Sequence, residues 1–157
     1  MLEEEDGTRL PDSDRIVPWL EAKFPAPAMP ATAPPEVGAK VFPAFRALLF
    51  APDGDATIAD KQAELERELE KVDAHLAAAA KPFLGGATLN ASDASLAPKL
   101  YHISVALPAI KGWRLPERFA AIRAYLAALP TSHAWAATDY GTDAIVAGWR
   151  AHLAAHH

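Results

Sequence analysis

Hydrophobic positions recur at a helical spacing over most of the chain. The longest stretch has apolar residues at steps of three, four and seven, and they fall on one helix face: Ile58, Leu65, Leu69, Val72 and Leu76. The charges between them are expected to form the solvated face of this helix, and they include Glu64, Glu66, Arg67, Glu68 and Lys71. The pattern predicts a long amphipathic helix.

Shorter patterns predict further helices on both sides of this one. Asn90 and Asp93 have the spacing of a capping box, which marks the start of a buried helix. Pro116 suits the first position of the next helix. Other apolar stripes lie within residues 37–49, 96–107, 119–129 and 145–153. Because strand signals are absent after residue 12, we expect a mostly α fold with a bundle of about five or six helices.

The N-terminal part has a different character. Nine of the fourteen prolines lie between Pro11 and Pro52, and residues 26–35 form a Pro/Ala-rich stretch that reads as a semi-rigid linker. Asp6-Gly7 predicts a turn after a short strand. A helix is then expected after the caps at residues 12–14, with a kink or a late start caused by Pro18.

Composition excludes several classes of function. The net charge of −5, without a basic patch, argues against nucleic acid, and no apolar run is long enough to span a membrane. The absence of cysteine excludes a disulfide, a zinc–thiolate site and a thiol nucleophile within these residues. His152 and His156 have the i, i+4 spacing of metal ligands but no third ligand nearby, so we expect no metal.

The acidic N-terminus is neither a signal nor a transit peptide. The sequence as written therefore predicts a cytoplasmic location. A plastid location is the alternative if a transit segment precedes Met1.

Three segments together resemble one family. Residues 82–86 (Pro-Phe-Leu-Gly-Gly), 95–102 (Ser-Leu-Ala-Pro-Lys-Leu-Tyr-His) and 147–149 (Ala-Gly-Trp) resemble the C-terminal domain of glutathione-dependent dehydroascorbate reductases. These enzymes belong to the glutathione transferase superfamily. Residues 11–17 and 20–25 are similar to the last helix of the thioredoxin-like domain in that family. The similarity runs from about residue 3 to about residue 150.

The resemblance implies three regions and a reaction. Residues 1–25 are expected to be a remnant of a thioredoxin-like domain, 26–35 the linker, and 36–157 a glutathione transferase C-terminal-like helical domain. In the family a Cys-Pro-Phe cysteine attacks dehydroascorbate, and two molecules of glutathione complete the reduction to ascorbate. Glutathione is thus the expected co-substrate, and a chain without that cysteine is expected to be inactive alone.

The resemblance also implies site residues, although no catalytic residue is assigned. Asp12 and Ser13 match a pair that holds the γ-glutamyl end of glutathione, and the simpler interpretation is a helix cap. His102 and Trp149 match positions near glutathione in the family. The simpler interpretation of His102 is a helix histidine that is bonded to a backbone carbonyl, and that of Trp149 is packing in the core. His152 replaces a frequent lysine, which weakens its prediction as an ascorbate contact.

Two other interpretations remain open at this point. The chain is a non-catalytic helical binding or scaffold module, with a protein partner over the uncovered domain interface, or it is a fragment of a complete enzyme. An exposed apolar face favours the module. The start within a strand, the missing cis-proline loop and the absence of cysteine favour the fragment. A longer transcript that encodes Cys-Pro-Phe upstream would decide between the two.

Overall fold

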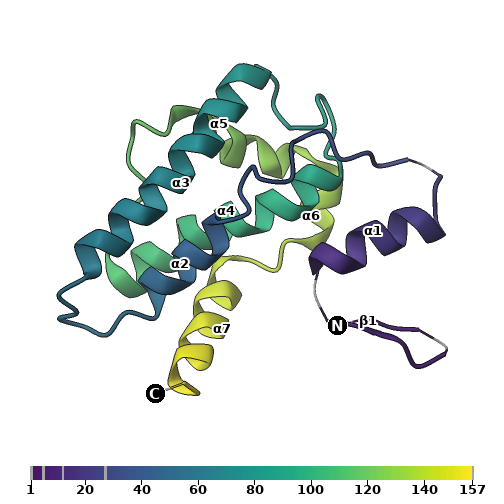
Figure 1. Cartoon of the computed structure of the whole chain (residues 1–157). Coiled ribbons are helices and arrows are strands. Elements are labelled where there is room, and N and C mark those ends of the chain that lie inside the picture. Colours follow the sequence, from purple (N-terminus) through teal and green to yellow (C-terminus); the bar gives the residue numbers. More distant parts are fainter. Residues whose placement is uncertain (1, 5, 12, 27, 157) are drawn as a thin grey trace.

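The computed structural model describes residues 2–4, 6–11, 13–26 and 28–156, without the side chains of Ser13 and Asp14. It is mostly α-helical, as predicted (Figure 1). Two short strands come first, β1 (Leu2–Glu3) and β2 (Arg9–Leu10). The helices are α1 (Ser13–Lys23), α2 (Val41–Leu49), α3 (Ile58–Ala79), α4 (Ala91–Lys111), α5 (Ala120–Ala128), α6 (His133–Thr138) and α7 (Thr142–Ala154).

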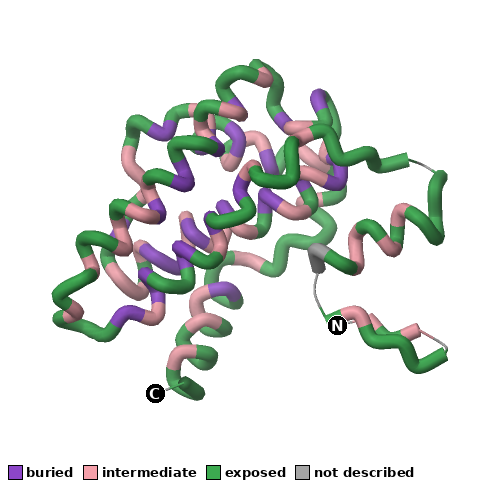
Figure 2. The backbone as a smooth tube through the Cα atoms, viewed as in Figure 1, coloured by how far each residue is buried: buried purple, intermediate pink, exposed green. Residues whose placement is uncertain are grey.

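The hydrophobic core lies among α2, α3, α4 and α5, where Figure 2 shows most of the buried positions. The predicted stripe of α3 is confirmed, since its buried apolar residues are Leu65, Leu69, Val72 and Leu76. They meet Phe45, Leu48 and Leu49 of α2, which are fully buried. The helix α7 packs on α4, and Ile145 is its buried residue.

One charge of α3 departs from the expected solvated face. Glu68 is 6% exposed, and its carboxylate accepts a hydrogen bond from Lys71 Nζ at 2.6 Å. Position 68 lies three residues after Leu65 and four before Val72, so it falls on the apolar stripe itself. The exposed Lys71 partner neutralises this carboxylate where the side chain enters the core.

The N-terminal hairpin and α1 lie beside the helical body, and none of their described residues is buried (Figures 1 and 2). The predicted turn is confirmed: β1 and β2 pair antiparallel, and Gly7 between them has φ +86°. The helix α1 starts at Ser13 and continues through Pro18, so the late start did not occur. Phe24, just after α1, is 59% exposed.

The prediction that Pro116 opens a helix was wrong. Residues 116–119 form a turn closed by the Phe119 N–H and the Pro116 carbonyl at 3.2 Å, and α5 begins at Ala120. Asp73 of α3 accepts a hydrogen bond from the Ile122 N–H at 2.9 Å, so a distant carboxylate caps this helix. No sequence pattern predicted α6, which has only six residues.

The start of α4 is built around one fully buried carboxylate, Asp93. The predicted capping box is present, because Asn90 accepts from the Asp93 N–H while Asp93 accepts from the Asn90 N–H at 2.9 Å. Asp93 also accepts hydrogen bonds from Leu84 N at 2.9 Å, Gly85 N at 2.9 Å and Tyr125 Oη at 2.8 Å.

Residues 82–86 form the tight turn that delivers two of these N–H donors. A Cβ on Gly85 would lie 2.3 Å from the Thr88 carbonyl oxygen, so this close approach requires glycine. The neighbouring Gly86 has φ +102°. The turn, the helix start and α5 are therefore joined through Asp93.

The Asp93→Ala variant should lose roughly 3–5 kcal/mol of unfolding free energy, because several buried donors lose their acceptor at once. Urea unfolding followed by circular dichroism measures this loss. Asp60→Ala, an exposed first-turn carboxylate of α3, is the control and should change stability by less than about 0.5 kcal/mol. Similar losses in both variants would contradict the role given to Asp93.

Candidate functional site

Two predicted site residues meet where α7 packs on α4. The Trp149 indole N–H donates a hydrogen bond to His102 Nδ1 at 3.1 Å, across 47 positions of sequence. Both side chains are partly buried, and their rings stand nearly perpendicular at 88° with centroids 6.0 Å apart. The pair thus has an apolar side toward the core and a polar edge toward solvent.

The hydrogen bond from Trp149 determines the protonation of His102. An indole nitrogen can only donate, so Nδ1 must accept and the neutral ring carries its proton on Nε2. His102 Nε2 lies 2.9 Å from the hydroxyl oxygen of Tyr140, which accepts that proton's hydrogen bond. Burial lowers the pKa of His102 below its ordinary value of 6.5. The site therefore holds a neutral imidazole at physiological pH.

Aromatic side chains surround Trp149. Its ring centroid lies 5.2 Å from that of Phe45 and 6.2 Å from that of Phe42, both on α2. Phe50, directly after α2, is 6.4 Å away. Trp149 therefore packs against the edge of the core, as the alternative interpretation expected, and also presents its N–H to His102. Its contact with glutathione stays a prediction.

His152 lies one turn after Trp149, with ring centroids 5.8 Å apart. Its ring centroid also lies 5.4 Å from that of Phe50 and 4.3 Å from that of His156. Among the residues that the structure describes, no group of three histidine, cysteine or carboxylate side chains is placed to hold a metal. The absence of a metal remains a prediction.

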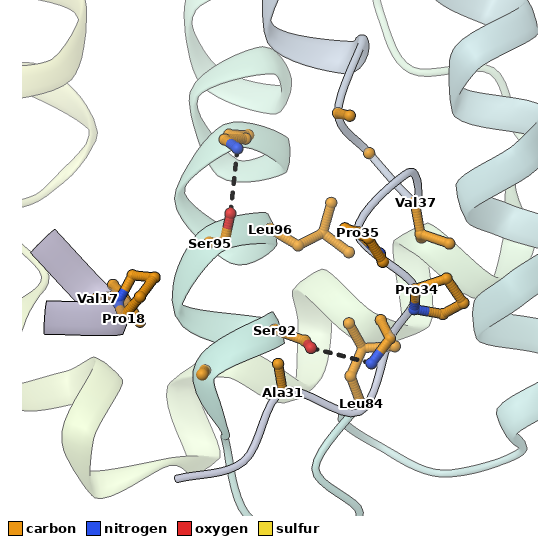
Figure 3. Close-up of a pocket in the computed structure, with 15 residues that line it drawn as sticks. Val17, Pro18, Ala31, Pro34, Pro35, Val37, Leu84, Ser92, Ser95 and Leu96 are labelled. Carbon is orange, nitrogen blue, oxygen red and sulfur yellow. Dashed lines mark hydrogen bonds between the residues drawn. The ribbon is translucent and has the colours of Figure 1, made fainter. Parts of the chain in front are cut away.

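A hollow lies between α1, the linker and α4 (Figure 3). Its volume is about 420 Å³, with Val17 and Pro18 on one side and linker residues on the other. Ser92 of α4 accepts hydrogen bonds from the N–H groups of Thr32 and Ala33, both at 3.0 Å. These bonds hold the linker against the first turn of α4.

The other predicted glutathione contacts lie at the start of α1. Asp12 lies outside the described residues, and Ser13 is the first residue of α1 with no side chain described. Their prediction as the γ-glutamyl site therefore stays a prediction. In general, the first N–H groups of an α-helix have no intrahelical partner, and such groups suit a carboxylate.

Sequence reasoning did not find Tyr140, the hydrogen-bond partner of His102. Tyr140 stands in the two-residue connection between α6 and the cap of α7, where no periodicity operates. In the sequence, the only local sign of a turn here was the Tyr140-Gly141 pair before a helical pattern. In the structure, Gly141 has φ +85°. Phe42 and Phe50 were likewise missed as neighbours of Trp149.

Comparison with known proteins finds a matching domain family and similar chains. The family model for the glutathione S-transferase C-terminal domain matches residues 55–128. The probable cytosolic glutathione S-transferase DHAR1 of Oryza sativa subsp. japonica is 38% identical over 92% of this chain and 66% of its own length. Glutathione S-transferase DHAR2 of Arabidopsis thaliana is 40% identical over 92% of this chain and 67% of its own length.

A solved structure is also similar. The crystal structure of Chlamydomonas reinhardtii dehydroascorbate reductase matches with a TM-score of 0.85 and 50% identity, over 96% of this chain and 70% of that one. The chain thus spans about two thirds of the length of these relatives. In the described part of the chain, no helix combines the length and apolarity needed to cross a membrane.

The neutral state of His102 should make folding depend on pH. Its folded pKa is lowered below 6.5, so between the folded value and 6.5 the unfolded chain binds more protons. The unfolding free energy should therefore increase as pH rises through that interval and decrease as pH falls. NMR titration of the His102 ring and urea unfolding at several pH values test both statements.

His102→Gln is the matched control, because glutamine keeps one acceptor and one donor without titrating. Its unfolding free energy should change less steeply with pH than that of the unmodified chain. Parallel curves for the two proteins, or a His102 titration at or above 6.5, would contradict the hydrogen-bond assignment.

Proposed function

Because the chain belongs to the dehydroascorbate reductase family of glutathione transferases, we propose that it forms the helical side of a cleft for glutathione and dehydroascorbate. The observation that carries the proposal is the hydrogen-bonded pair of His102 and Trp149. The pair joins two helices that are separate in sequence and brings both predicted glutathione contacts together. His102 Nδ1 is bonded to Trp149 rather than to backbone, and Trp149 combines this bond with packing against the core.

The chemistry of the pair suits a peptide-like ligand. The neutral imidazole keeps a carbon edge and one N–H, while the indole supplies a large flat surface. Phe42 and Phe50 extend that surface beside Trp149. A ligand held here is partly desolvated, which strengthens the few polar contacts it makes.

We assign His152 to the neighbouring position for dehydroascorbate or ascorbate. Its ring lies 5.8 Å from that of Trp149 and is exposed to solvent. An imidazole can donate to a carbonyl or enediol oxygen of such a ligand.

We place the γ-glutamyl carboxylate of glutathione at the start of α1, near Asp12 and Ser13. Helix N-termini attract anions through free N–H groups and the helix dipole. The hollow of about 420 Å³ beside Val17 and Pro18 offers room along this helix. This assignment rests on the resemblance and on the position of Ser13 at the helix start.

The redox step needs a thiol that these 157 residues do not contain. In the proposed reaction a protein thiolate attacks dehydroascorbate, and one glutathione displaces ascorbate to leave a mixed disulfide. A second glutathione then attacks the mixed disulfide at its glutathione sulfur, which frees the protein thiolate and forms glutathione disulfide. In total, two glutathione thiols are oxidised and one dehydroascorbate is reduced. The residues present here bind and orient the two substrates.

A non-catalytic binding module is the second candidate, and a specific observation favours it. Leu20, Phe24 and Met29 are exposed by 38%, 59% and 38%, along α1 and the linker. Grouped apolar side chains of this kind often mark a protein interface. We propose that this face takes a protein partner in either function.

The relatives are described as cytosolic and chloroplastic, and we propose the cytoplasm for the sequence as written.

Glutathione titrated into the purified chain should produce saturable chemical-shift changes at the Trp149 indole and the His102 ring. Trp149→Phe keeps the packing but removes the N–H, and it should weaken binding by about fivefold, the equivalent of one hydrogen bond. Trp135→Phe, on α6 and outside the proposed cleft, is the control and should bind glutathione like the unmodified chain. A folded helical spectrum without any binding would favour the module.

Activity provides a separate test. Mixed with glutathione and dehydroascorbate, the chain should form ascorbate no faster than a protein-free mixture, because it lacks the thiol. Ultraviolet absorbance of ascorbate follows the reaction. A glutathione-dependent rate that scales with protein concentration would contradict the requirement for an additional cysteine.

A further inference from the structure

Another hollow lies beside His102, between α4, α6 and the connection to α7. Its volume is about 220 Å³, and four of its eight lining residues carry aromatic rings. Tyr101 and His102 come from α4, Trp135 from α6, and Tyr140 from the connection. Neither the predicted glutathione contacts at α1 nor His152 takes part in it.

The rings of this aromatic box stand as two perpendicular pairs. Tyr101 and Trp135 have centroids 5.2 Å apart with an interplanar angle of 87°. His102 and Tyr140 have centroids 6.5 Å apart with an angle of 89°. Such an arrangement provides ring faces and edges on different sides of one small space, which a rounded ligand can contact simultaneously.

The lining of the box carries negative charge and no positive charge. Asp139 contributes the only carboxylate among the lining residues, and none of them is a lysine or arginine. His102 does not add a positive charge, because its Nδ1 accepts the Trp149 N–H. The Asp139 carboxylate is positioned by the Gly141 N–H at 2.9 Å and lies 3.5 Å from the Tyr101 hydroxyl. The box therefore favours a cation over a neutral or anionic ligand.

We propose that this aromatic box binds a methylated ammonium ion. Aromatic faces attract a cation through the ring quadrupole, and a nearby carboxylate adds direct charge attraction. A quaternary ammonium has no N–H groups that need acceptors, which fits walls made mainly of carbon. Pro98 and Ile145 complete the lining with further apolar surface. The box lies beside the proposed glutathione cleft and shares His102 with it, and it adds a second ligand class to this chain.

The occupant of the box also contacts groups that reach the other site. Tyr140 forms one wall and accepts the hydrogen bond from His102 Nε2 at 2.9 Å. His102 in turn accepts the hydrogen bond of Trp149. Binding in the box should therefore change the Trp149 indole resonance as well as that of Trp135.

Choline and its neutral analogue 3,3-dimethyl-1-butanol provide the first test, because they share a shape and differ in charge. Each is titrated into the full chain at constant ionic strength, with the Trp135 and Trp149 indole resonances as readouts. We expect saturable binding of choline that is at least about tenfold tighter than that of the alcohol. Equal affinities would show a merely apolar pocket, and no saturation with choline would show no site; either result overturns the proposal.

Two matched variants test the carboxylate. Asp139→Asn keeps an oxygen acceptor for the Gly141 N–H but removes the charge, and it should weaken choline binding by about tenfold. Asp143→Asn removes the same charge from the exposed first turn of α7, outside the box, and should leave choline affinity within about twofold. Equal losses in both variants would assign the effect to net charge and overturn the site.

The outcome is separable from that of the proposed function. Glutathione titration monitors the Trp149 side of His102 and uses Trp149→Phe, whereas choline titration uses Asp139→Asn. Failure of choline binding with intact glutathione binding would remove only the aromatic box. The reverse result would remove the cleft and leave the box.

Discussion

The buried carboxylate of Asp93 is the interaction on which the rest of the structure depends. It is fully buried, and hydrogen bonds from the protein stabilise its charge. Backbone N–H groups of Leu84, Gly85 and Asn90 donate to it, together with the Tyr125 hydroxyl. Burial and the adjacent carboxylate raise the pKa of Tyr125, so its hydroxyl keeps the proton that it donates. An ionised group in the core is tolerated only with such complete solvation by the protein.

Asp93 determines where α4 starts, and α4 carries the candidate site. His102 lies nine residues after Asp93, which is two and a half helical turns. At that separation the two residues lie on opposite faces, so Asp93 meets α5 while His102 meets α7. The same helix thus fixes the core with one face and presents the imidazole with the other. A shift in the start of α4 would rotate His102 away from Trp149.

Local patterns in the sequence predicted the elements whose causes are local. The stripe of α3 and the capping box of α4 depend on residues within one helix, and both were predicted correctly. The start of α5 depends on Asp73 from another helix, so no nearby residue could indicate it. Glu68 was misjudged because its burial depends on its position in the stripe, which the charge alone conceals.

The site was predictable only in part, for the same reason. His102 and Trp149 were identified through the family resemblance, but their mutual hydrogen bond spans 47 positions and required the fold. Tyr140 lies in a connection without periodicity, and its bond to His102 spans 38 positions. The roles of Asp12 and Ser13 remain predictions, since they depend on side chains outside the described residues.

The two nitrogen atoms of His102 connect the proposed glutathione cleft with the proposed aromatic box. Nδ1 accepts the hydrogen bond of Trp149 on the cleft side, and Nε2 donates to the hydroxyl of Tyr140 on the box side. A protonated ring could not accept from Trp149, so the cleft geometry requires the neutral form. The same neutrality removes a positive charge from the wall of the box and leaves Asp139 as its only charged group. Burial, which lowers the pKa of His102, therefore serves both sites at once. Protonation would break the bond to Trp149 and place a cation beside the one that the box is proposed to hold.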